Sequence, residues 1–162
     1  EEQTEERVYY TALNQKRYKR LDKTIEIPEE KAQFFINYPK SVCLLVITES
    51  WCADAAQIVP VVHKIAELNP KITMKLVFRD ENEALMNLFL TNGGKAIPIV
   101  VFLDLEDKVL AHWGSRPTKM VEEEKAKNGK LSPEFKENLQ RWYNQDKGAT
   151  IVDDFKKILE TI

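Results

Sequence analysis

The fold is decided by the stretch 41–55, which reads SVCLLVITESWCADA. Its first part, 41–48, is an apolar run without alternation, which is typical of a strand buried on both faces. The residues after it place apolar side chains at helical spacing and predict an amphipathic helix from near Cys52 to just before Pro70. Pro60 lies inside that helix and predicts a kink. A buried strand that leads directly into such a helix indicates an α/β architecture.

The sequence on either side predicts alternating helices and strands, then a hairpin and a helical tail. Asn92-Gly93-Gly94 is a turn signal that should end the helix before it. This order implies an α/β/α three-layer sandwich with a mixed sheet, an N-terminal helix and a C-terminal helical extension. The expected helices are 4–20, 28–38, 83–90, 117–127, 133–146 and 151–161, and the other expected strands are 72–79, 97–103 and 109–113.

The composition fits one globular domain that spans residues 1–162. The chain has 24 Lys and Arg against 26 Asp and Glu, a formal charge of −2, and 43% of its residues are hydrophobic. This balance argues against electrostatic binding of nucleic acid, and no apolar run reaches the roughly 20 residues that cross a membrane. The chain begins EEQTEERV, without a signal-peptide pattern, so we expect a cytoplasmic protein. The sequence does not begin with Met, which is also compatible with a leader that has been cleaved off.

Cys52 is the first candidate for chemistry, because it stands where the buried strand passes into the helix. Unpaired backbone N–H groups and the helix dipole favour an anion there, which lowers the pKa of a thiol and makes a nucleophilic thiolate. Trp51 would shield one side of the thiol and offer a flat apolar surface to a partner. Glu49 and Asp54 place negative charge beside the thiol and oppose its ionisation.

Ile97-Pro98, at the start of a predicted strand, is the second candidate feature. Pro cannot donate to the hydrogen-bond ladder, so its place there needs a reason. An Ile–Pro bond can be cis, and a cis bond would turn the backbone of Ile97 outward, toward anything docked at the thiol. We therefore expect Trp51, Ile97 and Pro98 to form a surface that binds a substrate.

Together these features resemble the thioredoxin family. The motif WCADA at 51–55 after an apolar strand, with Pro60 eight residues beyond the cysteine, is similar to the active-site helix of thioredoxins. The segment AIPIVVF at 96–102 looks like the strand that carries their cis-proline. The resemblance covers a core at about 25–114 and leaves the N-terminal helix and the extension at about 115–162 outside. It implies a thioredoxin-like fold with the cysteine of the motif as nucleophile.

The sequence departs from the family at the position of the second active-site cysteine, where it has Ala55. The family's buried acid corresponds to Val46 and its buried lysine to about Leu76, so the resemblance implies that the usual proton-handling groups are missing. No thiol adjacent to Cys52 could resolve a mixed disulfide. Cys43 lies mid-strand, far from the helix tip at about 3.3 Å per residue, so we expect a small buried hydrophobe instead of a resolving thiol.

The two histidines are expected to be ordinary. His63 lies eleven residues along the helix from Cys52, about 16 Å away, which excludes a Cys–His dyad. His112 suits a packing role, and neither histidine forms a zinc spacing with Cys52 and Asp54. Four residues of the tail are expected to pack it onto the body: Phe135, Leu139, Trp142 and Tyr143.

Three functions are compatible with these residues. The first is thiol–disulfide exchange by a single-cysteine oxidoreductase, in which Cys52 attacks a protein or small-molecule disulfide and a low-molecular-weight thiol such as glutathione releases the product. The second is a redox-inactive thioredoxin-like module that binds partners through Trp51 and Pro98. The third, a monothiol glutaredoxin-like iron–sulfur carrier, is weaker because no glutathione-binding pattern accompanies the cysteine. The same motif would also result if the second cysteine had been substituted in order to trap partners as mixed disulfides. We expect no cofactor, no metal, no nucleic acid and no membrane partner.

Overall fold

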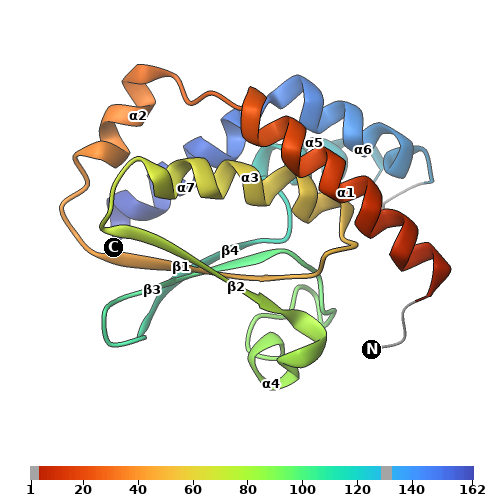
Figure 1. Ribbon diagram of the computed structural model, residues 1–162, viewed down its shortest axis with the longest axis horizontal. Coiled ribbons are helices and arrows are strands. Elements are labelled where there is room, and N and C mark those ends of the chain that lie inside the picture. Colours follow the sequence, from red (N-terminus) through yellow and green to blue (C-terminus); the bar gives the residue numbers. More distant parts are fainter. Residues whose placement is uncertain (1–3, 129–132) are drawn as a thin grey trace.

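The computed structural model describes residues 4–128 and 133–162 (Figure 1). A mixed sheet of four strands lies at its centre, in the order β2-β1-β3-β4. β1 pairs with β2 in parallel and with β3 antiparallel, and β3 forms an antiparallel pair with β4. The expected α/β fold and its hairpin are therefore confirmed. The strands are β1 (Val42–Thr48), β2 (Ile72–Phe78), β3 (Ile99–Leu103) and β4 (Val109–Gly114).

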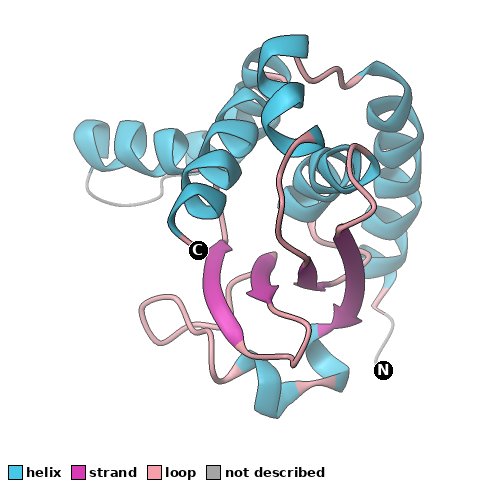
Figure 2. Ribbon diagram, turned by 90° about the vertical axis from the view of Figure 1, so that its left-hand side faces the viewer, coloured by secondary structure: helices cyan, strands magenta, loops and turns pink. Residues whose placement is uncertain are grey.

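The long helices gather on one face of the sheet and the short α4 (Glu83–Met86) lies on the other (Figures 1 and 2). α3 (Ala53–Glu67) continues through the buried Pro60, and α1 (Glu5–Thr24) packs along α3. On the opposite face the ring of Phe89 contacts His112 at a centroid distance of 5.3 Å. The remaining elements are α2 (Glu29–Ile36), the 3-10 turn η1 (Arg79–Glu81), α5 (Thr118–Asn128), α6 (Pro133–Asp146) and α7 (Ala149–Thr161).

Two expected helix ends are wrong. The helix expected over 4–20 continues to Thr24. The helix expected over 83–90 ends at Met86, so Asn92-Gly93-Gly94 does not terminate it. Instead Thr91 and Gly94 exchange two backbone hydrogen bonds of 2.9 Å around a tight turn. Asn92 and Gly93 have positive φ angles of 50° and 77°, which such a turn requires and which Asn and Gly tolerate.

The C-terminal tail is anchored to the sheet through α7. The fully buried Phe155 makes edge-on ring contacts with Phe102 of β3 and Trp113 of β4. The Trp113 indole donates to the Asp154 carboxylate at 2.9 Å, and the Thr118 hydroxyl donates to the same carboxylate at 2.6 Å. Of the four residues expected to pack the tail, Leu139 and Tyr143 are buried and Trp142 is partly buried, whereas the side chain of Phe135 lies outside the described residues.

Candidate functional site

Cys52 caps the N-terminus of α3. Its Sγ accepts a hydrogen bond from the Ala55 N–H at 3.4 Å, and its thiol donates to the Ile97 carbonyl oxygen at 3.6 Å. The Ile97–Pro98 peptide bond is cis. The structure therefore brings the thiol and the backbone before Pro98 into contact, although they are 45 residues apart in the chain.

Burial dominates the electrostatics of this thiol. Cys52 is only 8% exposed, and its removal from water raises the pKa of the thiol to about 11. The N–H groups of Ala55 and Asp54 and the Arg116 guanidinium lower that pKa, while the Asp54 carboxylate raises it. Desolvation thus outweighs the helix N-terminus, and the resting thiol is protonated at neutral pH.

The Asp54 carboxylate links the start of α3 to the C-terminal third of the chain. It is buried, and it accepts two hydrogen bonds of 3.2 Å from the Arg116 guanidinium and one of 2.7 Å from the Tyr143 hydroxyl. Burial and the Asp54 charge hold the pKa of Tyr143 well above its ordinary value. No sequence pattern singled out Arg116, and Tyr143 was expected to have only a packing role.

No second thiol lies beside Cys52. Ala55, at the position of the family's second cysteine, is fully buried. Cys43 is half-buried near the start of β1, where it pairs with Thr73 and Leu103, while Cys52 follows the other end of that strand. Both cysteines are free thiols. The geometry therefore offers no intramolecular resolving thiol.

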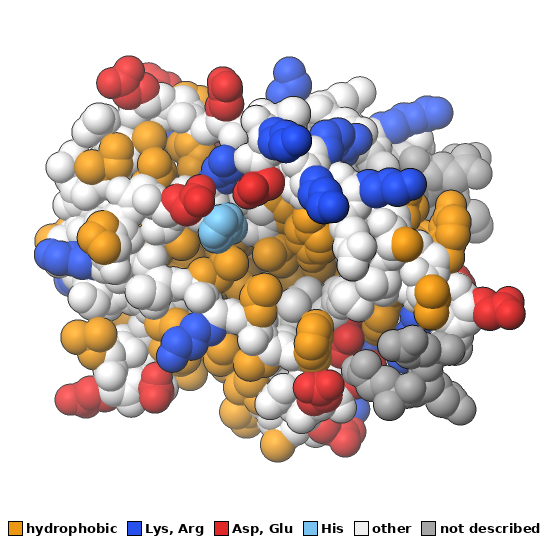
Figure 3. Space-filling view, in the orientation of Figure 1, with side chains coloured by type: hydrophobic (Ala, Val, Ile, Leu, Met, Phe, Trp, Pro, Cys, Tyr) orange, Lys and Arg blue, Asp and Glu red, His pale blue; other side chains and the backbone are white. Residues whose placement is uncertain are grey.

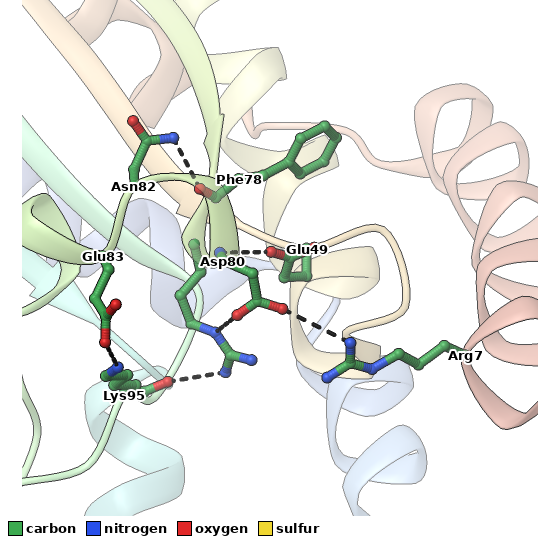
Figure 4. A network of polar contacts seen from close by, with 8 residues as sticks. Arg7, Glu49, Phe78, Asp80, Asn82, Glu83 and Lys95 are labelled. Atoms are coloured by element: carbon green, nitrogen blue, oxygen red, sulfur yellow. Dashed lines mark hydrogen bonds and ion pairs between the residues drawn. The ribbon is translucent and has the colours of Figure 1, made fainter. Parts of the chain in front are cut away.

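Trp51 lies against two guanidinium groups. The Cζ atom of Arg7 is 4.6 Å from the ring centroid and that of Arg79 is 5.1 Å away. Asp80 holds both arginines, with contacts of 3.7 Å to Arg7 and 2.9 Å to Arg79 (Figure 4). The buried Glu49 carboxylate accepts a hydrogen bond of 2.9 Å from the Asp80 N–H. Glu49 thus orients the residue that holds the two arginines.

The N-terminal helix belongs to the site as well. Asn14 is fully buried, and its side-chain amide donates to the carbonyl oxygens of Ser50 and Cys52 at 2.9 and 3.0 Å. The Thr11 hydroxyl lies 3.2 Å from that of Ser50. The sequence analysis missed these residues, and the one available signal was an Asn inside a helix of strong helix formers.

Two cavities adjoin Cys52, and both are lined by Trp51, Cys52 and Arg116. One, of about 720 Å³, lies on the side of α1, and the other, of about 770 Å³, lies on the side of Ile97.

Across residues 4–128 and 133–162, no group of three or more His, Cys, Asp or Glu side chains could hold a metal ion. His63 is a surface residue near Asp22, at 3.6 Å.

Comparison with known proteins supports the same fold. A family model described as Thioredoxin matches residues 1–128, which include the N-terminal helix that the resemblance had left outside. No curated protein matches the sequence. A crystal structure of a Pseudomonas aeruginosa protein of unknown function is similar with a TM-score of 0.74 and 19% identity, over 95% of this chain and 90% of that one. A crystal structure of an HIV epitope scaffold is similar with a TM-score of 0.72 and 20% identity, over 96% of this chain and 92% of that one. Similarity at this identity shows the fold alone.

None of the helices in the described part of the chain is long and apolar enough to cross a membrane.

Proposed function

The chain belongs to the thioredoxin family, and from this premise we propose that it carries out thiol–disulfide exchange through Cys52 alone. The observation that best supports this function is the placement of the thiol, which caps α3, contacts the Ile97 carbonyl and lines both cavities. We assign the surface that receives the disulfide-bearing partner to Trp51, which is partly exposed, and to the backbone at Ile97 and Pro98, whose side chains are buried. Because Ala55 replaces a resolving cysteine, an external low-molecular-weight thiol completes the cycle.

The proposed reaction has two exchange steps. The Cys52 thiolate attacks one sulfur of the substrate disulfide, that S–S bond breaks, and the departing half leaves as a thiolate that takes up a proton. An external thiolate then attacks the mixed disulfide at the substrate sulfur and releases Cys52, which is reprotonated. A thiol with a pKa of about 11 is a poor leaving group, so we expect the mixed disulfide on Cys52 to be long-lived.

The raised pKa also favours a second candidate function, a redox-inactive binding module. With a pKa of about 11, the thiolate fraction at pH 7 is roughly one in ten thousand. In a binding module the cysteine serves only to cap α3, and partners dock on the Trp51 and Pro98 surface without covalent chemistry. Exchange and binding therefore differ in whether the sulfur atom is needed.

The pH dependence of alkylation should follow the raised pKa. Only the thiolate reacts, so the rate at Cys52 should rise about tenfold for each pH unit between 7 and 10 and level off only near pH 11. Iodoacetamide labelling followed by intact-protein mass spectrometry measures this rate, and Cys52→Ser supplies the background from Cys43. A plateau at or below pH 8.5 would contradict the account of a desolvated thiol.

The function itself is tested by adduct formation with bis(2-hydroxyethyl) disulfide at pH 9. We expect wild type to gain one mixed disulfide that an added thiol removes, Cys52→Ser to gain none, and Cys43→Ser to behave as wild type. Mass spectrometry before and after the thiol reports both steps. If wild type forms no adduct, exchange is excluded, and the binding-module function takes its place.

A further inference from the structure

Arg17 is a cation without a carboxylate partner in the cavity on the α1 side. It is half-buried, lines that cavity together with Cys52, and donates to the Asn14 side-chain oxygen at 3.0 Å. Among the side chains that the structure describes, at 4–126 and 138–162, no carboxylate lies at ion-pair distance from its guanidinium. Burial and then the neighbouring Arg20 lower the pKa of Arg17, so both effects make its charge costly.

The other arginines of this cavity are already paired. Arg116 is held by Asp54 at 3.2 Å, and Arg7 lies 3.7 Å from Asp80. Glu6 is the one acid that lines the cavity among the described residues, against three arginines. Lys and Arg side chains also gather over the side of the molecule that carries α1 (Figure 3). Among the described residues, Arg17 is therefore the arginine of this cavity that no carboxylate holds.

We propose that this cavity binds the carboxylate end of a small anionic disulfide or thiol, with Arg17 as the counter-ion that directs its sulfur to Cys52. The proposal rests on the proposed exchange function and names its substrate class. One amide joins the two groups, because Asn14 accepts from the Arg17 guanidinium and donates to the Cys52 carbonyl oxygen at 3.0 Å. The probe for this class is a disulfide with a short carbon arm between sulfur and carboxylate.

The covalent step is the exchange described above, and it leaves a carboxylate-bearing half of the substrate disulfide on the Cys52 sulfur. The Cys52 thiolate displaces one half of 3,3′-dithiodipropionate, which leaves as 3-mercaptopropionate and takes up a proton. The other half stays on Cys52 as a mixed disulfide whose carboxylate pairs with Arg17. A later external thiolate releases it, so no further oxidant or reductant is required.

A comparison of matched disulfides tests the proposal. 3,3′-Dithiodipropionate and bis(2-hydroxyethyl) disulfide have arms of similar length and differ chiefly in charge. We expect wild type to react faster with the dianion, and Arg17→Met to lower the ratio of the two rates about tenfold, the worth of a charge-assisted hydrogen bond. Arg17→Lys should restore part of the ratio. Lys19→Met removes an equal, exposed charge from the other side of α1 and should leave the ratio unchanged.

A binding measurement separates this proposal from the exchange function. Octanedioate has the length of 3,3′-dithiodipropionate but no sulfur, and 1,8-octanediol is its neutral counterpart. We expect octanedioate, and not the diol, to shift the NMR signal of the Arg17 side-chain Nε–H, and Arg17→Met to weaken binding detected at Trp51. Equal rates for both disulfides, or no octanedioate binding, overturn the proposal while leaving exchange intact. Octanedioate binding without any adduct supports an anion site and excludes exchange.

Discussion

Replacing Asp54 by Asn should lower the free energy of unfolding by about 3 kcal/mol or more, because it removes the charged partner from a buried ion pair. The Asp54 side chain is only 12% exposed and that of Arg116 24%, so water cannot replace the lost carboxylate fully. The Tyr143 hydroxyl, 2.7 Å from the carboxylate, also loses its charged acceptor. Urea denaturation of the full chain measures the change.

The same substitution should activate the thiol. The Asp54 charge raises the pKa of Cys52 and the Arg116 charge lowers it, so Asp54→Asn moves the alkylation midpoint downward. Asp153→Asn is the matched control, because its pair with Lys31 is part-exposed and should be worth less than about 1 kcal/mol. A variant that loses no stability, or whose midpoint rises, would contradict the assigned role of this carboxylate.

Gly114→Ala should destabilise the protein by about 3 kcal/mol or more. A Cβ atom at Gly114 would lie 2.4 Å from the Pro98 carbonyl oxygen and 3.2 Å from the Ile99 Cα, and both are backbone atoms that cannot turn aside. The φ angle of +128° adds strain for any residue with a side chain. The collision falls next to Ile97, whose carbonyl oxygen contacts the thiol.

Gly93→Ala provides the comparison for this prediction. Gly93 also has a positive φ, of +77°, but a Cβ there meets nothing within 4 Å. Gly93→Ala should therefore lower the free energy of unfolding only by the conformational strain, about 1–2 kcal/mol. Thermal and urea unfolding of both variants distinguish strain from collision, and equal losses at the two glycines would refute the close approach of Gly114 to the Pro98 backbone.

The parts of the fold that local patterns encode were predictable from the sequence. The bounds of β1 and α3 were predicted almost to the residue, from the apolar run before Glu49 and the helical spacing after Cys52. A strand buried on both faces shows a continuous apolar run, whereas a helix buried on one face shows apolar residues at helical spacing. The meeting of Cys52 with Ile97 also followed, through the family resemblance. In contrast, the helix expected to reach residue 90 ended at Met86, and the chain continues in turns in which the N–H groups of Leu88 and Phe89 donate to the carbonyl oxygens of Leu85 and Met86.

The surroundings of the thiol were not predictable in this way. Arg17 has cationic neighbours of similar helix propensity along α1, and no local pattern indicates which of them turns inward. Arg116 and Tyr143 reach Asp54 from 62 and 89 residues away. The sequence indicated that the helix N-terminus lowers the pKa of the thiol and that nearby acids raise it. Burial has the largest effect on this pKa, and burial depends on tertiary packing, which no local pattern shows.

The bond between Asp54 and Tyr143 has a consequence for the order in which the protein is made. Tyr143 is synthesised 89 residues after Asp54. At about 5–20 residues per second, a ribosome takes roughly 4 to 18 seconds to cover that distance. Throughout that interval the nascent chain carries the Asp54 carboxylate without the Tyr143 hydroxyl that donates to it in the folded protein. This contact between the start of α3 and the C-terminal third of the chain can therefore form only late in synthesis.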